Sequence, residues 1–164
     1  MRPLPPGIRR YKPLRDVTAD DIAPRDWHTV DLNSADFAHR DLIGHDFRYR
    51  TFVHANLDGA NLEGANLKRA HLKRAHLTGA NLEGAYLTGA NLENANLSGA
   101  RLEGANLQDA NLEDANLQDA NLGYAHLTGA NLKGANLSYA NLEEAELEGD
   151  DREEDDVEHV IDLP

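Results

Sequence analysis

Apolar residues recur at every fifth position through the centre of the chain. Leucine occupies residue 57 and each fifth residue up to Leu147, and alanine stands two residues before each of these leucines, from Ala55 to Ala145. The unit reads Ala-Asn-Leu-x-x, as in residues 60–64. Residues 30–149 form 24 consecutive pentapeptides without an insertion. In the first of them the leucine position is held by Leu32, Phe37, Leu42, Phe47 and Phe52.

A period of five fits neither a regular α-helix nor a regular strand. On a helix, steps of five residues advance by roughly 500° and spread the leucines over the whole surface. On a strand, successive leucines alternate between the two faces. Five residues can instead form a short extended piece and one corner, so that four units close a square coil of about 20 residues. We expect alanine and leucine to point inward, and glycines such as Gly59 to occupy corners with positive φ.

The first pentapeptides depart from this pattern at the alanine position. Arg40, His45 and Arg50 stand where later units have alanine. Their side chains are too large for the space that an inward alanine fills. We expect a local distortion there, or a cavity that admits the stems of these side chains.

The repeats resemble those of the pentapeptide-repeat proteins, whose motif is A-[D/N]-L-x-x. The resemblance covers 120 of the 164 residues. It implies an all-β fold, a right-handed quadrilateral β-helix of about six coils. It also implies that inward Asn or Asp side chains before the leucine tie the turns together.

Composition narrows the classes of function. The chain has 29 Asp and Glu against 16 Lys and Arg, a formal charge of −13, and it has no cysteine. Direct nucleic-acid binding is disfavoured, because that affinity comes mainly from cations that neutralise phosphates. Disulfides and thiolate metal sites are excluded. No apolar run is long enough to span a membrane and none resembles a signal peptide, so we expect a cytoplasmic protein without a membrane partner.

Acidic side chains fall into register on the predicted coil, because residues 20 apart stack on one face. One such column and the fifth coil (105–124) supply the candidate partner-binding residues. These are Glu63, Glu83, Glu103, Asp109, Glu113, Asp114, Asp119 and Glu143. Two interpretations stay open: an anionic strip that imitates a row of phosphates, and a solvated face that keeps the rod soluble.

The other polar clusters do not indicate a catalytic or metal site. A basic cluster in the third coil could meet an acidic partner or the tail of another copy, or it is an ordinary surface patch; it consists of Lys68, Arg69, Lys73 and Arg74. His54, His71 and His76 show no spacing typical of a metal site. No set of nucleophile, base and orienting group is visible. We expect no enzyme, no metal and no cofactor.

The two ends differ from the repeats in composition. Residues 1–29 are predicted to be an N-terminal cap with a basic, Pro-rich arm. Residues 150–164 combine an acidic run with an apolar tip, which is predicted to cover the last coil or to reach a second chain. By resemblance to the quinolone-protecting branch of the family, a homodimer through a coil end or this tail is expected. Its possible contact residues are Val157, Val160, Ile161 and Leu163.

Two functions fit these features. The first is a non-catalytic, rigid scaffold for protein–protein interaction, because the predicted rod is decorated on the outside and filled inside. The second comes from the resemblance: some pentapeptide-repeat proteins imitate DNA, bind DNA gyrase and protect it from inhibitors. Net charge and the glutamate column favour this alternative. The short rod, with phenylalanine only at 37, 47 and 52 and no loop insertion, speaks against it.

Overall fold

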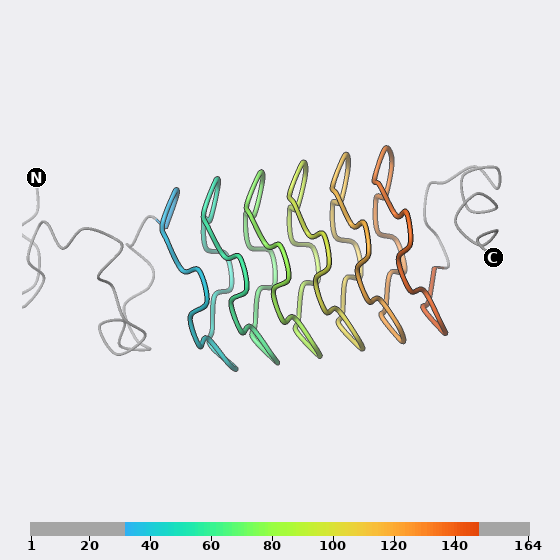
Figure 1. Cartoon of the computed structure of the whole chain (residues 1–164), viewed down its shortest axis with the longest axis horizontal. Helices are drawn as coiled ribbons and strands as arrows, with labels where there is room; N and C mark the ends of the chain where they lie inside the picture. The colour runs from blue at the N-terminus through green and yellow to red at the C-terminus, as the bar shows by residue number, and fades with distance from the viewer. Residues whose placement is uncertain (1–31, 148–164) are drawn as a thin grey trace, which may run out of the picture.

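The computed structural model describes residues 32–147, which wind into coils stacked along one axis as a rod (Figure 1). The predicted cap 1–29 and tail 150–164 lie outside the described residues, as do the four possible dimer contacts, Val157, Val160, Ile161 and Leu163.

Backbone pairing repeats with a period of 20 residues. Isolated parallel bridges join each paired residue to the one 20 positions later, from Asp36 and Asn56 to His126 and Glu146. Within 32–147 the structure has these single bridges and no helix or longer strand. The Leu62 N–H donates to the Asn81 carbonyl at 2.7 Å, in the next coil. Four pentapeptides therefore make one coil, as the period of five predicts.

A tight turn closes each corner of the coil. The Ala65 N–H donates to the Leu62 carbonyl at 2.9 Å, and the two residues between them form the turn. The second turn residue has positive φ at every corner, as Gly64 does at 61°. Glycine is not required there, because 13 corners hold another residue type. Each of these non-glycine corners stores roughly 1–2 kcal/mol of backbone strain.

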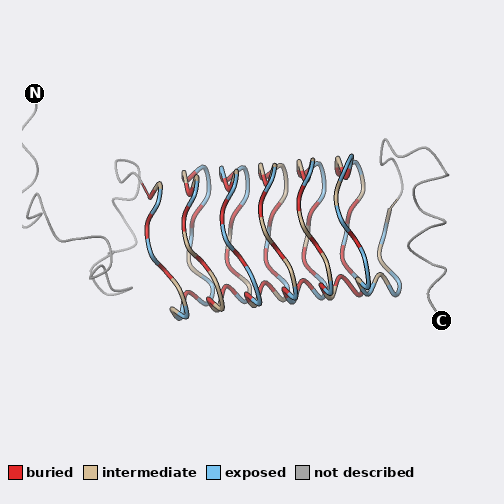
Figure 2. Cartoon of the chain, turned by 45° about the horizontal axis from the view of Figure 1, so that its top comes forward, coloured by how far each residue is buried: buried red, intermediate tan, exposed pale blue. Residues whose placement is uncertain are grey.

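The alanine and leucine positions fill the interior of the rod. Side chains at both positions are almost completely buried from Leu32 to Leu137, except for Arg40, His45 and Ala135, and the buried positions recur on every coil (Figure 2). This confirms the predicted inward direction. In the last described coil, Leu142 and Leu147 are only partly buried. Each fully buried leucine contributes about 1.5–3 kcal/mol from burial of its apolar surface.

Aromatic side chains pack the first described coil. The rings of Phe37 and Phe47 each meet Phe52 edge to face, with centroids 6.0 and 5.2 Å apart. His45 stacks on Phe47 at 5.7 Å. These larger rings fill the end of the core where the alanine positions carry bulky residues.

The coil absorbs those bulky residues without breaking its backbone pairing. The carbonyls of Arg40, His45 and Arg50 accept the N–H groups of the next coil at 2.8, 2.9 and 2.7 Å. Of the two expected outcomes, a local distortion is therefore not seen in the backbone pairing, and the cavity stays a prediction. Arg40 and His45 stay half-buried, whereas Arg50 is buried, and desolvation lowers its pKa.

Asparagines before the leucines connect the coils from outside, so their predicted inward direction is wrong. These side chains are partly or fully exposed along the rod. The Asn116 Oδ1 accepts the Gln118 N–H at 3.2 Å and the Asn136 Nδ2 at 3.1 Å, and the Asn116 Nδ2 donates to the Asn96 Oδ1 at 3.1 Å. The amides thus form ladders between coils while the interior is left to alanine and leucine.

Candidate interaction surface

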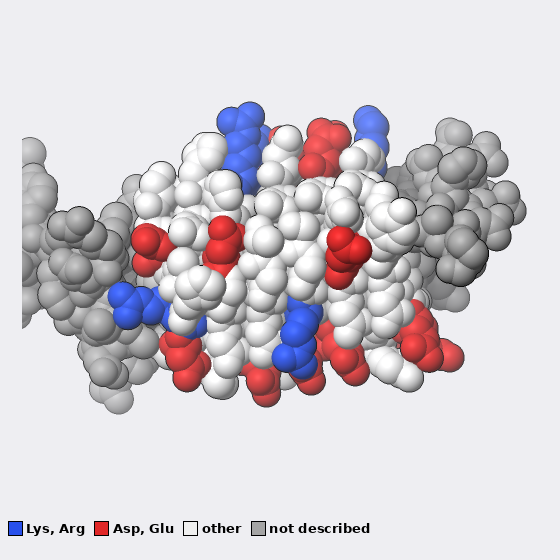
Figure 3. All heavy atoms as spheres, in the orientation of Figure 1, with Lys and Arg blue, Asp and Glu red and all other residues white. Residues whose placement is uncertain are grey.

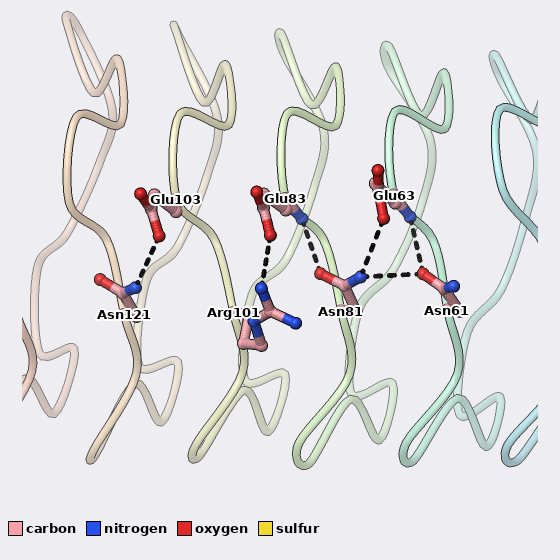
Figure 4. Close-up of polar contacts among 7 residues, drawn as sticks. All are labelled: Asn61, Glu63, Asn81, Glu83, Arg101, Glu103 and Asn121. Carbon is pink, nitrogen blue, oxygen red and sulfur yellow. Dashed lines mark hydrogen bonds and ion pairs between the residues drawn. The ribbon is translucent and has the colours of Figure 1, made fainter.

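The glutamate column lies on one face, as the 20-residue register requires. We call Glu63, Glu83 and Glu103 the glutamate ladder, because they follow one another in successive coils (Figure 4). Gly123 takes the next place in this column, and Glu143 follows in the coil after it. Four of the eight candidate residues therefore share a face, with a gap before the last.

Each ladder carboxylate contacts a polar side chain of the following coil. The Glu63 Oε2 accepts from the Asn81 Nδ2 at 3.4 Å, and the Glu103 Oε2 accepts from the Asn121 Nδ2 at 3.2 Å. The equivalent place beside Glu83 is held by Arg101, whose Nη2 lies 2.5 Å from the Glu83 Oε2 (Figure 4).

Arg101 interrupts the negative charge in the middle of the ladder. This ion pair was not predicted, because only residues 20 apart were expected to stack. Glu83 and Arg101 are 18 residues apart: Glu83 follows a leucine, and Arg101 stands at the asparagine position of the next coil. Arg101 was visible in the sequence as the one arginine at an asparagine position of the later repeats. The pair is largely exposed, so it changes local charge more than stability.

The remaining candidate residues do not join the ladder. Asp109, Glu113, Asp114 and Asp119 come from three other faces of the rod, because they follow Leu107, Leu112 and Leu117 in the coil. They surround the fifth coil instead of forming one patch. The structure therefore brings together half of the eight residues and distributes the others around the axis.

Basic groups are mixed with the acidic ones. The Lys73 Nζ lies 2.7 Å from the Glu93 Oε1 one coil later. Arg48 forms a bidentate pair with Asp46, with distances of 2.8 Å from Nε and 2.6 Å from Nη2. This hydrogen bond holds the pKa of Asp46 below its ordinary value. Figure 3 shows acidic side chains separated by uncharged and basic groups on the face in view.

The basic cluster divides into paired and unpaired cations. Lys73 is bound to Glu93, and the Lys68 Nζ lies over the Tyr86 ring, 5.3 Å from its centroid. Arg69 and Arg74 are exposed at corners with φ of 55° and 57°. The guanidinium group of neither arginine forms an ion pair or hydrogen bond within residues 32–147.

Exposed tyrosines are a feature that the sequence analysis missed. Tyr49, Tyr86, Tyr124 and Tyr139 are each about half to two thirds exposed, from 48% to 66%. Tyr49, Tyr124 and Tyr139 also occupy corners with positive φ. A tyrosine at the last position of a unit, where glycine is frequent, is the sequence signal for such a site.

Two features, a metal-binding group and a membrane-spanning helix, are absent from residues 32–147. This part of the chain holds no group of three or more histidine or carboxylate side chains arranged to bind a metal ion. It also contains no apolar helix of membrane-spanning length.

Comparisons place this rod among known proteins. The family model described as pentapeptide repeats matches eight copies, over residues 31–69, 55–94, 85–122 and 115–149. Members of that family are generally structural or interaction proteins and not enzymes. A search of curated proteins finds no match.

Several solved structures are similar. HetL, a pentapeptide repeat protein involved in heterocyst differentiation regulation in the cyanobacterium Nostoc sp. strain PCC 7120, is 34% identical over 73% of this chain and 62% of its own, with a TM-score of 0.51. The pentapeptide repeat protein alr5209, from Nostoc PCC 7120, is 45% identical over 46% of this chain and 62% of its own, with a TM-score of 0.45. QnrB1, a plasmid-mediated fluoroquinolone resistance protein, is 18% identical over 85% of this chain and 92% of its own, with a TM-score of 0.40.

The chain spans less than two thirds of the length of HetL and of alr5209. Together, the repeat match over most of the sequence and the coil of four pentapeptides settle the classification. The chain belongs to the pentapeptide-repeat family, whose members form right-handed β-helices.

Proposed function

We propose that this protein is a non-catalytic scaffold that binds a protein partner through the outside of a rigid rod. One observation carries the proposal. The inward positions are filled by alanine, leucine and phenylalanine, and continuous backbone hydrogen bonds join the coils. Apart from Arg40, His45 and Arg50, variation in side-chain chemistry therefore lies at the outer positions, which are held at coil spacing, about 4.8 Å along the axis.

Such a surface is suited to recognition because it is ordered before binding. A partner that docks on a preorganised surface loses less conformational entropy than one that must order a loop. The ladder carboxylates gain further order from the Asn81, Arg101 and Asn121 side chains that they contact. We infer that this face is the first surface to test for a partner.

The test is affinity capture with full-length protein and a variant in which the ladder is neutral. Glu63→Gln, Glu83→Gln and Glu103→Gln keep the size of each side chain and remove three charges. We expect the triple variant to melt like the wild type and to lose a protein that the wild type retains. Melting is unaffected because the ladder lies outside the core and contributes little to stability.

A matched control removes three charges elsewhere. Asp36→Asn and Asp58→Asn preserve the oxygens that accept the Ala38 and Thr78 N–H groups, and Asp119→Asn changes an exposed corner, all on another face of the rod. This control should retain the partner. If both variants retain every captured protein, the ladder is not the binding surface.

DNA mimicry with DNA gyrase as the partner is the second candidate. The formal charge of −13 and the glutamate ladder favour it. The spacing counts against it, because each strand of duplex DNA carries one charge per roughly 3.4 Å along its axis, whereas the coils advance by about 4.8 Å. Arg101 also neutralises Glu83 within the ladder.

Supercoiling by DNA gyrase, measured with and without a quinolone and at increasing salt, tests this candidate. Mimicry predicts inhibition or protection that weakens as salt screens the carboxylates. An absence of any effect on supercoiling would reject gyrase as the partner and leave the scaffold function with another protein.

A further inference from the structure

A second surface, separate from the glutamate ladder, combines free cations with exposed aromatic rings. We call Tyr49, Lys68, Arg69, Arg74 and Tyr86 the basic-aromatic patch. Tyr49 and Arg69 are 20 residues apart and stack at one corner of successive coils. The Lys68 Nζ lies over the ring of Tyr86, which belongs to the next coil. Arg74 stands at the following corner of the same coil as Arg69.

The local charge of this patch is positive because nearby ion pairs are already complete. Asp46 is bound by Arg48, and Glu93 is bound by Lys73. Lys68, Arg69 and Arg74 form no ion pair with a carboxylate within residues 32–147. An anionic group that arrives here would therefore meet three available cations.

The backbone at this patch has the positive φ that every corner of the coil shares. Tyr49, Arg69 and Arg74 have φ of 61°, 55° and 57°, where glycine fits at no steric cost. The same corner holds Gly89 one coil after Arg69, so the coil accepts glycine at this place. The turn therefore does not require the large side chains of Tyr49, Arg69 and Arg74, which are exposed to solvent where a partner can reach them.

We propose that the basic-aromatic patch binds the C-terminal segment of a second copy of this chain. Residues 150–156 read Asp-Asp-Arg-Glu-Glu-Asp-Asp, which complements the three cations. The apolar residues that follow would pack on the exposed rings of Tyr49 and Tyr86; they are Val157, Val160, Ile161 and Leu163. The segment thus matches the patch in both charge and apolar character.

Geometry favours a second copy over the same molecule. Leu147 lies on the face of Lys68 but four coils away, roughly 19 Å along the axis. About six extended residues are needed to cover that distance, which would use up most of the acidic run. The returning segment would also pass Asp109, which stands two coils beyond Arg69 at the same corner. Reciprocal exchange between two copies avoids both problems and gives a closed two-fold dimer.

The experiment is sedimentation equilibrium of the full-length protein over a range of concentrations. At low salt, about 50 mM, the wild type should approach the mass of a dimer, and at about 500 mM its dissociation constant should rise at least tenfold, because salt screens the charges. Arg69→Gly and Arg74→Gly together should weaken association at least tenfold.

The same double variant has a second readout that a merely structural role would not produce. Glycine relieves the strain at both corners, so the melting temperature should stay the same or rise while association is lost. A control with Lys12→Gln and Lys133→Gln removes two cations outside the patch and should still dimerise. A double variant that dimerises like the wild type, or a control that dissociates equally, would overturn the proposal.

A mixing experiment identifies the occupant of the patch. A tail variant converts the six carboxylates of 150–156 to amides and keeps the patch intact; it carries D150N, D151N, E153Q, E154Q, D155N and D156N. Alone it should be monomeric. The tail variant should form a heterodimer with the Arg69→Gly, Arg74→Gly variant. In this heterodimer the intact patch of the tail variant binds the intact tail of the other chain.

Failure of this mixing, or a wild type that is monomeric at every concentration, would overturn the proposal. Binding of labelled single-stranded DNA at the patch, stronger than self-association, would instead assign the cations and rings to nucleic acid. None of these results depends on the glutamate ladder, so the scaffold function can stand or fall independently.

Discussion

Replacement of Leu102 by alanine should destabilise the rod strongly. Leu102 is fully buried and lies between the leucines of the coils before and after it, Leu82 and Leu122. Its backbone is fixed at 2.7 Å to the Asn121 carbonyl, and the neighbouring Arg101 carbonyl accepts the Leu82 N–H at 2.7 Å. These hydrogen bonds prevent the coils from moving together to fill a cavity.

The magnitude follows from the atoms removed. Three carbons leave the core, which costs about 2.4 kcal/mol at roughly 0.8 kcal/mol for each. The unfilled cavity raises this to about 3–4 kcal/mol, within the range of buried leucine-to-alanine changes. At about 3–4 °C for each kcal/mol in a domain of this size, the melting temperature should fall by roughly 10 °C.

Circular dichroism during heating measures this shift, with Leu142→Ala as the control. Leu142 occupies the same position in the coil but is only partly buried in the last described coil. Its replacement should cost less than half as much, because its side chain is only partly buried among the described residues and fewer contacts are lost. Equal shifts for the two variants, or a change of less than about 2 °C for Leu102→Ala, would refute the packed interior.

Three other predictions concern the surface and the C-terminal residues. Asn116→Ala should lower the free energy of unfolding in urea by about 1–3 kcal/mol, because it removes the two hydrogen bonds to Asn96 and Asn136. Asn106→Ala should cost less, because Asn106 has no asparagine neighbour in the adjacent coils. The Arg48 hydrogen bond lowers the pKa of Asp46, so this bond should stabilise the fold slightly above roughly pH 4, and the stabilisation should be lost as the pH falls further. In thermal melts from pH 7 to pH 3, Asp46→Asn should lose less stability than the wild type. Deletion of 150–164 should leave the melting curve of the rod nearly unchanged and abolish the dimer in light scattering; an unchanged mass would contradict the tail contact.

Sequence alone predicted the coil because every repeat shows the same pattern of inward and outward positions. An alanine and a leucine in every five residues define which positions point inward, as Ala60 and Leu62 do at 0% exposure. The corner follows from the same spacing and is confirmed at Gly64. No long-range information is needed, since each coil copies the pairing of the one before it.

The errors arose where one side chain meets another across coils. The direction of the asparagines was wrong because the interior has room only for alanine and leucine, so Asn116 and its equivalents bond along the outside. The Glu83 to Arg101 pair depends on the lateral offset between two outer positions, which the period does not specify. Positive φ was expected at glycine corners such as Gly59, but the pattern did not indicate that other residues, such as Arg69, adopt the same torsion.

Residue-resolved hydrogen exchange of the full-length protein tests most directly whether the coils form one rigid, continuous platform. The account predicts slow exchange at the leucine-position N–H groups in successive coils, such as Leu62, Leu82 and Leu102, whose hydrogens bond to the next coil at 2.7 Å. Protection should continue through Phe47 and Phe52, beside the bulky alanine-position residues. Fast exchange at these amides, or protection that stops between coils, would contradict a rigid rod and the surface that it presents.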